Sequence, residues 1–295
     1  MNSFLDEFKV YLKDVKKCSN NTFDAYIRDV ERFIKYCTGK GIASLNDIRN
    51  TDISDYLEFN KLNGKSDSTK TRITASIRCY FKFLYTNNYI SVNCAQDIKN
   101  PRNERVIPEI LSSSDVLNLL AQPDVVDFKG MRDKAMLELL YATGIKVSEL
   151  IDLNLTDINL QIGILHINSH HHERIVPIYQ TAVKHISEYI NVARPVMISD
   201  LNEQKLFTNC NGKPMSRQGF WKIIKYYSKK AGISKEITPQ TIRHSFAAHL
   251  LENGAQLGDI KDMLGHSDIS STQVYAQILK SKYIQSYAKF HPLAK

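Results

Sequence analysis

The segment 157–178 constrains the fold most, because it has strand-type sequence inside a chain whose other segments carry helical periodicity. It contains three short apolar stretches, Ile158–Leu160, Ile164–Ile167 and Arg174–Ile178, and the residues between them are typical of tight turns. Strands of this length form only a small sheet, so helices have to provide most of the core. We therefore predict a mainly α-helical fold with a small antiparallel β-sheet.

Helical periodicity covers most of the remaining sequence. A first amphipathic segment runs from Phe4 to Val15, and a second follows Ser19-Asn20-Asn21 and ends near Gly39. Further helices are predicted over about 52–62, 66–87, 112–121, 129–143, 180–193, 216–231, 240–253, 256–264, 270–276 and 281–289. A short extended piece is expected at Lys205-Leu206-Phe207.

A linker is expected between two domains. Residues 95–108 contain two prolines and a run of polar residues without apolar periodicity. We predict a helical domain over residues 1–95, a linker over 96–107 and a second domain over 108–295. The chain has 295 residues, so both domains are long enough to bury a core of their own.

The composition favours a polyanionic partner without proving one. The formal net charge of +8 suits nucleic acid, although solubility alone also accounts for a basic balance. No apolar run approaches the ~20 residues that cross a bilayer, so we expect no association with a membrane. The five cysteines are scattered without metal-site spacing, which predicts a reduced, cytoplasmic protein with no metal ion.

The segment 66–87 has a basic face of the kind that a DNA-binding helix needs. Its apolar residues, among them Ile73, Ile77 and Phe81, recur at helical spacing and predict a buried face. The basic residues on or beside the other face are expected to be free for solvent or DNA phosphates: Lys65, Lys70, Arg72, Arg78 and Lys82. If they bind DNA, this helix enters the major groove. A solvated charged face is the alternative.

Three side chains that suit phosphate chemistry follow one another near the C-terminus. Arg243 offers a permanently charged, planar fork for phosphate oxygens, His266 a second donor, and Tyr275 a phenol nucleophile. Each has a structural alternative: Arg243 could form a surface salt bridge, His266 could be favoured by the dipole at a helix C-terminus, and Tyr275 could pack in a core. His244 and His249 lie on the same predicted helix as Arg243 and are expected to be structural.

These residues lie in a segment that resembles the catalytic segment of the tyrosine recombinases, the integrase and Xer group. TIRHSFAAHLLENGA and LGHSDISSTQV carry the resemblance there, while YATGIKVSEL and HERIVPI carry it earlier in the second domain. The spacing from Thr22 through Tyr26 and Asp29 to Phe33 resembles the family's N-terminal domain.

The resemblance implies a DNA-processing function. Members of the family cut and rejoin double-stranded DNA through a 3′-phosphotyrosine without a cofactor, and Tyr275, Arg243 and His266 match three of their catalytic positions. A two-domain, C-shaped clamp around the duplex is expected. The last predicted helix, 281–289, is expected to join neighbouring subunits on DNA, either copies of this chain or a partner recombinase.

Three positions depart from the catalytic set that the resemblance implies. Lys146 stands in place of an arginine, Ser169 in place of the general-acid lysine, and Gln240 in place of a histidine. Lysine keeps the charge of arginine but lacks its bidentate fork.

Two accounts of these departures stay open. In the first, Lys146 grips the phosphate and a hairpin histidine, His172 or its neighbours His170 and His171, protonates the leaving group. The alternative for these three histidines is that they form a polar turn and take no part in the reaction. In the second account, cleavage is impaired or lost, and the chain serves as a DNA-binding regulatory or architectural protein. A third reading, a basic helical interaction protein that does not bind DNA, requires basic residues dispersed over the folded surface.

Overall fold

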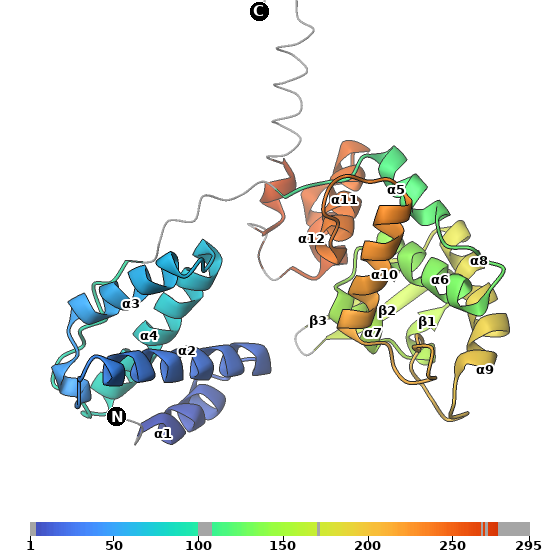
Figure 1. Ribbon diagram of the computed structural model, residues 1–295. Helices are drawn as coiled ribbons and strands as arrows, with labels where there is room; N and C mark the ends of the chain where they lie inside the picture. The colour runs from blue at the N-terminus through green and yellow to red at the C-terminus, as the bar shows by residue number, and fades with distance from the viewer. Residues whose placement is uncertain (1–3, 100–107, 170–171, 267, 269–270, 277–295) are drawn as a thin grey trace, which may run out of the picture. The chain divides into compact units, whose positions relative to one another are not determined.

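The structure is a computed structural model of the chain, shown in Figure 1. It describes residues 4–99, 108–169, 172–266, 268 and 271–276. The chain divides into two compact units, Met1–Arg105 and Val106–Lys295, and each unit is described by itself. Within the described residues, no helix is long and apolar enough to cross a membrane.

Unit 1 is a bundle of helices. Its elements are α1 (Leu5–Val10), a π-helical turn at Tyr11–Val15, α2 (Asn20–Gly39), a 3-10 turn at Leu45–Asp47, α3 (Asn50–Leu62) and α4 (Asp67–Thr86). Serine side chains start the two long helices: the Oγ atoms of Ser19 and Ser66 each accept a backbone N–H three residues later at 3.3 Å. Aromatic side chains fill the core between α1, α2 and α4, and they include Phe8, Phe33, Tyr80 and Phe81.

Unit 2 contains the sheet and the larger core. Its elements are α5 (Ser113–Ala121), α6 (Phe128–Thr143), α7 (Val147–Asp152), a 3-10 turn at Leu155–Asp157, β1 (Ile158–Asn159), β2 (Ile164–Ser169), β3 (His172–Pro177), α8 (Gln180–Glu188), a π-helical turn at Tyr189–Ala193, α9 (Arg194–Met197), α10 (Arg217–Lys230), α11 (Pro239–Glu252) and α12 (Leu257–Leu264). A last helical turn at 273–276 carries Tyr275.

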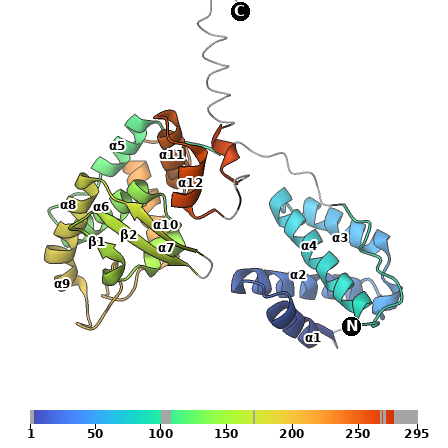
Figure 2. The ribbon, with the colours of Figure 1, turned by 180° about the vertical axis from the view of Figure 1, so that it is seen from behind.

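The strands form an antiparallel sheet in the order β1-β2-β3. Leu165 pairs with Val176 near the end of the hairpin away from its turn, and both are fully buried against the helices. The last pair of the register is Ser169 with His172, at the end of the hairpin. Figure 1 shows α10 in front of unit 2, and Figure 2 shows the sheet in front when the unit is seen from behind, so α10 and the sheet lie on opposite sides.

The predicted fold class is confirmed, and most elements lie where they were expected. The extended piece near Lys205 exists as an isolated bridge to Asn154. The helix α7 was not predicted, because its six residues are too few to show a helical repeat. Ile98 still packs in the core of unit 1, although it falls in the segment expected to be a linker. Residues 100–107 of that predicted linker and the predicted helix 281–289 lie outside the described residues.

Candidate active site

Arg243 lies where the C-terminal ends of two helices meet. It is only 2% exposed, and its guanidinium donates to the carbonyl oxygens of Gly144 (2.6 Å) and Leu264 (2.8 Å). Gly144 and Gly265, with φ of 59° and 63°, end α6 and α12 and leave these carbonyls without helical partners. The cation therefore satisfies both helix ends and is locked in place by them.

The charge of Arg243 persists despite its burial. Burial lowers the pKa of its guanidinium to about 10, with Glu149 and Tyr275 opposing the shift. The side chain is thus positive at neutral pH. A guanidinium has five N–H donors, and the hydrogen bonds found here use three of them. Donors of Arg243 therefore remain for a phosphate.

His266 is held as a neutral ring by its two partners. Its Nε2 lies 3.0 Å from the NH2 group of Arg243, and its Nδ1 lies 3.0 Å from the hydroxyl of Thr272. Arginine can only donate, so Nε2 accepts and Nδ1 carries the proton. Burial, and then the charges of Arg243 and Lys146, lower the pKa of His266 to about 4.

Tyr275 is buried beside the same helix. It is 1% exposed and packs with Phe246, Ile260 and Leu264. Its hydroxyl lies 2.9 Å from Nδ1 of His244. Burial raises the pKa of the phenol, while the charge of Arg243 opposes that rise. The candidate nucleophile is therefore protonated at neutral pH and is hydrogen-bonded to a histidine.

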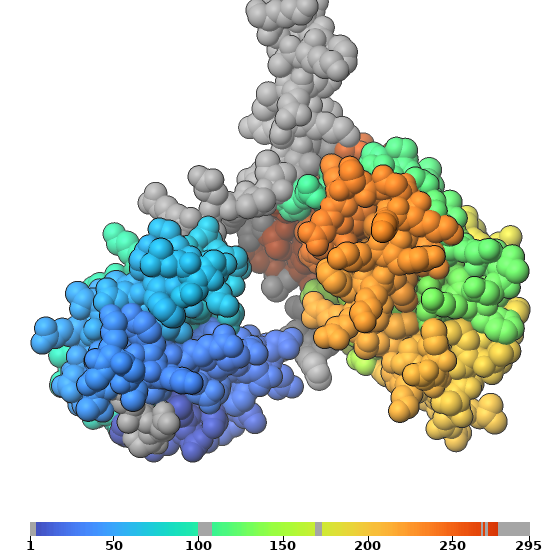
Figure 3. All heavy atoms as spheres, in the orientation of Figure 1, coloured from blue at the N-terminus to red at the C-terminus, as the bar shows by residue number. Residues whose placement is uncertain are grey.

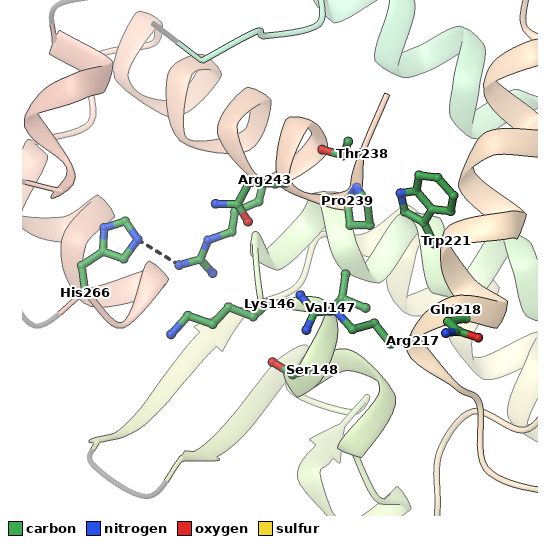
Figure 4. A pocket seen from close by; sticks show the side chains of 11 residues that line it. Lys146, Val147, Ser148, Arg217, Gln218, Trp221, Thr238, Pro239, Arg243 and His266 are labelled. Carbon is green, nitrogen blue, oxygen red and sulfur yellow. Dashed lines mark hydrogen bonds between the residues drawn. The ribbon is translucent and has the colours of Figure 1, made fainter. Parts of the chain in front are cut away.

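A pocket of about 580 Å³ opens beside Arg243 (Figure 4). Its lining includes three of the expected site residues besides Arg243, namely Lys146, Gln240 and His266. Lys146 is exposed and precedes the first residue of α7, while Gln240 is exposed in the first turn of α11. Tyr275 is not among the lining residues. It is held beside the site by its hydrogen bond to His244 and by its packing against Phe246 and Leu264.

Seven of the eleven residues that line this pocket were not predicted as site residues, among them Arg217 and Trp221. Arg217 and Trp221 lie one turn apart at the start of α10 and face the pocket, with the cation of Lys225 over the Trp221 ring. Figure 3 shows that the atoms of α10, in orange, form much of the face of unit 2 turned to the viewer. The available signal was an arginine and a tryptophan at helical spacing in a helix rich in lysine.

The hairpin carries the remaining expected site residues. Ser169 ends β2 and pairs with His172, the first residue of β3; nothing is described of their side chains, and His170 and His171 lie outside the described residues. The structure therefore brings the backbone of His172 to the end of the hairpin.

An ion pair ties the hairpin to α7 and α12. Arg174 on β3 donates to both carboxylate oxygens of Glu149, at 3.1 and 2.7 Å, and to the carbonyl of Met263 at 2.8 Å. Burial opposes the charge of Glu149, but these bonds and the backbone N–H of Lys146 outweigh it and hold the pKa of the carboxyl below its usual value. A Cβ atom at Gly265 would lie 2.7 Å from the Arg174 guanidinium, so glycine lets the His266 loop pass close to it.

The basic residues of unit 1 fall into two groups. Lys65, Arg78 and Lys82 are exposed, as expected. The expectation that Lys70 and Arg72 are free is wrong, because each is paired with a carboxylate at 2.5 Å, Lys70 with Asp67 and Arg72 with Asp29. Asp29 is buried, and its charge needs a partner from within the bundle.

Two basic pockets lie beside α4. One, of about 640 Å³, includes Lys16, Arg78 and Lys82 in its lining, and the other, of about 310 Å³, includes Arg28 and Arg32. Lys16, Arg28 and Arg32 were not predicted, because they lie far before the basic run at 65–82 in the sequence and line these pockets only in the folded unit. Within the described part of the chain, no group of three His, Cys, Asp or Glu residues could hold a metal ion.

Arg72→Ala should destabilise unit 1, whereas Arg78→Ala should not. Removing Arg72 leaves the buried carboxylate of Asp29 with only a 3.4 Å contact to Ser76, and the expected cost is about 1–3 kcal/mol in the free energy of unfolding. Arg78 is exposed, so its loss should stay within about 0.5 kcal/mol. Urea denaturation of the two variants measures the difference, and equal stability would contradict a structural role for Arg72.

Both parts of the chain are similar to known protein families. Residues 109–282 match the Phage integrase family, and residues 5–88 match the Phage integrase, N-terminal SAM-like domain. The chain is 40% identical over 295 residues to the tyrosine recombinase XerD of Staphylococcus epidermidis and 39% identical over 297 residues to that of Listeria innocua, and the alignments cover 100% of this chain and of each relative.

Two solved structures share the fold. A XerH site-specific recombinase bound to its palindromic difH substrate superposes with a TM-score of 0.78 at 18% identity, covering 98% of this chain and 84% of that chain. A lambda integrase dimer bound to a COC′ core site gives 0.73 at 17% identity, covering 93% of this chain and 94% of that chain. These likenesses agree with the predicted fold class.

Proposed function

Because the chain belongs to the phage integrase family of tyrosine recombinases, we propose that it cleaves and rejoins double-stranded DNA at a specific site through a 3′-phosphotyrosine. The observation that carries the proposal is the cluster of Arg243, His266 and Tyr275 around the end of α12, beside a pocket with further cations. The relatives of this length are named as recombinases, which supports the same reaction class.

The proposed chemistry divides the work among these side chains. Tyr275 attacks the phosphorus atom, and the 5′ oxygen leaves. Arg243 uses its remaining N–H groups to hold the non-bridging oxygens, with Lys146 as a second cation across the pocket. Negative charge that develops on these oxygens is thereby stabilised by donors that the fold has already oriented.

We propose further that cleavage is slower than it would be with the family's arginine, lysine and histidine at positions 146, 169 and 240. Lys146 supplies a point charge in place of a bidentate fork, and Gln240 offers an amide that cannot exchange a proton. Ser169 does not titrate in the physiological range, so a hairpin histidine such as His172 is the proposed source of the proton for the leaving group.

An inactive DNA-binding regulatory or architectural protein is the second candidate. The three departures at Lys146, Ser169 and Gln240 favour it, because the loss of one oriented donor costs about 10²–10³ in rate. A nicked suicide substrate separates the two candidates, since an active chain accumulates a covalent adduct and an inactive one only binds. Whether the chain is active or only binds DNA, we propose that several subunits associate through residues 281–289, either as copies of this chain or with a partner recombinase. We also propose that the protein acts in the cytoplasm.

DNA affinity should fall steeply as salt rises, and Arg78→Ala with Lys82→Ala should reduce that dependence. Exposed cations beside α4 release counterions when they meet phosphates, and each lost contact lowers the slope of log K against log salt by about 1. Fluorescence anisotropy with a labelled duplex at several salt concentrations gives the slope. Lys184→Ala on α8 is the matched control, because this exposed lysine lies outside both basic pockets. Salt-independent binding would argue against a phosphate interface.

A further inference from the structure

The contact between His244 and Tyr275 is the most specific feature of the site that the reaction described above leaves unused. Nδ1 of His244 lies 2.9 Å from the phenol oxygen, and the two rings are 5.6 Å apart between centroids at an angle of 54°. We infer that His244 is the general base that takes the proton from Tyr275 during cleavage. This inference rests on the proposed function and assigns a further catalytic residue to it.

The position of His244 on α11 fits that role. It stands one turn after Gln240, so the two side chains share a face of the helix. Gln240 is exposed at the pocket, and its amide cannot take up a proton. His244 therefore provides the proton acceptor that position 240 lacks, and it already contacts the phenol oxygen.

The protonation state of His244 also fits. Burial, followed by the neighbouring charge of Arg243, lowers the pKa of its imidazole to about 4. At neutral pH the ring is uncharged, and in the tautomer that carries its proton on Nε2 the Nδ1 atom accepts from the phenol. A phosphate bound to Arg243 offsets the positive charge that depresses the pKa, so His244 becomes a stronger base when DNA occupies the pocket.

The proton and the electron pairs balance in both directions. In cleavage, the phenol oxygen forms the bond to phosphorus, the bond from phosphorus to the 5′ oxygen breaks, and the phenolic proton moves to Nδ1 of His244. The leaving 5′ oxygen takes its proton from a separate acid or from water. In rejoining, the 5′ hydroxyl attacks phosphorus and gives its proton back to the separate base or to water, the bond from phosphorus to the Tyr275 oxygen breaks, and His244 returns its proton to the released phenolate.

A second pair on the same helix provides a matched control. The hydroxyl of Tyr141 lies 2.9 Å from Nδ1 of His249, which is the same contact at the same length. Nε2 of His249 donates to the carbonyl of Leu111 at 3.0 Å, so its Nδ1 accepts from the phenol. This pair has the chemistry of the first pair, but its tyrosine lies outside the TQVY segment that carries the nucleophile.

The test compares His244→Asn with His249→Asn on a nicked suicide substrate. Asparagine keeps a hydrogen-bonding group near the position of Nδ1 but cannot take up a proton. We expect His244→Asn to lower the rate of adduct formation about 100-fold, within the range of general base catalysis, and His249→Asn to stay near the wild type. A ring-fluorinated tyrosine at position 275, whose phenol is more acidic, should narrow the gap between His244→Asn and wild type because it needs less help from a base.

The outcomes are distinct. The inference is overturned if His244→Asn forms the adduct at a rate equal to or above that of the wild type. It is also overturned if the ratio of the wild-type rate to the His244→Asn rate is the same with the fluorinated tyrosine as with ordinary tyrosine. In either case, the contact between His244 and Tyr275 is structural or restrains the nucleophile. A wild-type chain that forms no adduct overturns the proposed cleavage and this inference with it. If His244→Asn fails to fold by circular dichroism, His244→Gln replaces it in the same comparison, and a rate for that variant equal to the wild type also overturns the inference.

Discussion

A Tyr275→Phe variant should form no covalent protein–DNA adduct, while a Tyr141→Phe variant should still form it. Phenylalanine keeps the ring that packs against Phe246 and Leu264 but lacks the oxygen that would bond to phosphorus. Tyr141 packs against the same cluster and bonds His249 as Tyr275 bonds His244, so its variant controls for packing and for a lost hydrogen bond. Denaturing gel electrophoresis of a labelled suicide substrate detects the adduct.

The same assay reports on the missing general acid. A substrate whose bridging 5′ oxygen is replaced by sulfur releases a thiolate, which leaves without a proton. If Ser169 in place of lysine limits the rate, wild-type protein should cleave the sulfur substrate faster than the normal one, by about 10²-fold or more. Tyr275→Phe should abolish cleavage of both. An adduct formed by Tyr275→Phe would show that another residue is the nucleophile, and equal rates for wild type on the two substrates would mean that a histidine of the hairpin already supplies the proton.

Much of the fold could be predicted because its elements are long and regular. The apolar spacing of Ile73, Ile77 and Phe81 predicted the buried face of α4, and all three are buried in the core of unit 1. The short helix α7 could not be predicted, because it begins after Gly144 and Lys146 and is held by tertiary contacts such as Glu149 with Arg174. Interactions between distant segments decide such an element more than its own sequence does.

The partners of the charged residues were the least predictable part. Arg72 looked like a surface cation on a basic helix, but Asp29, 43 residues earlier, draws its guanidinium into the bundle. Arg243 could be picked out as a phosphate ligand, yet nothing local to it indicates that the ends of α6 and α12 supply two of its acceptors. His244 was expected to be structural, and its contact with Tyr275 depends on how the last turn folds back onto α11.

Restoring the three departed positions together should raise adduct formation, and this is the sharpest test of whether the site has lost activity. The variant combines Lys146→Arg, Ser169→Lys and Gln240→His. Lys146 and Gln240 are exposed on the pocket wall, so their replacements have room for larger side chains. Each restored donor or acid is worth about 10²–10³ in rate, and the gain of all three should reach at least that size without multiplying, because residues that act as a unit are not additive.

The single changes decide between the two accounts of the site. If the chain uses altered chemistry, Lys146→Arg alone should give little, since Lys146 already neutralises the phosphate, and Ser169→Lys should compete with the hairpin histidines. If the chain is an inactive binder, each single change should leave adducts near the background, and only the combination should produce them. The rate of adduct formation with the suicide substrate measures the effect of the single changes and of the combined change. DNA affinity is the control, because a change in binding alone would alter the yield at low DNA concentration and not at saturation. An efficient wild type with no gain in the restored variant would refute the idea that these three residues limit cleavage.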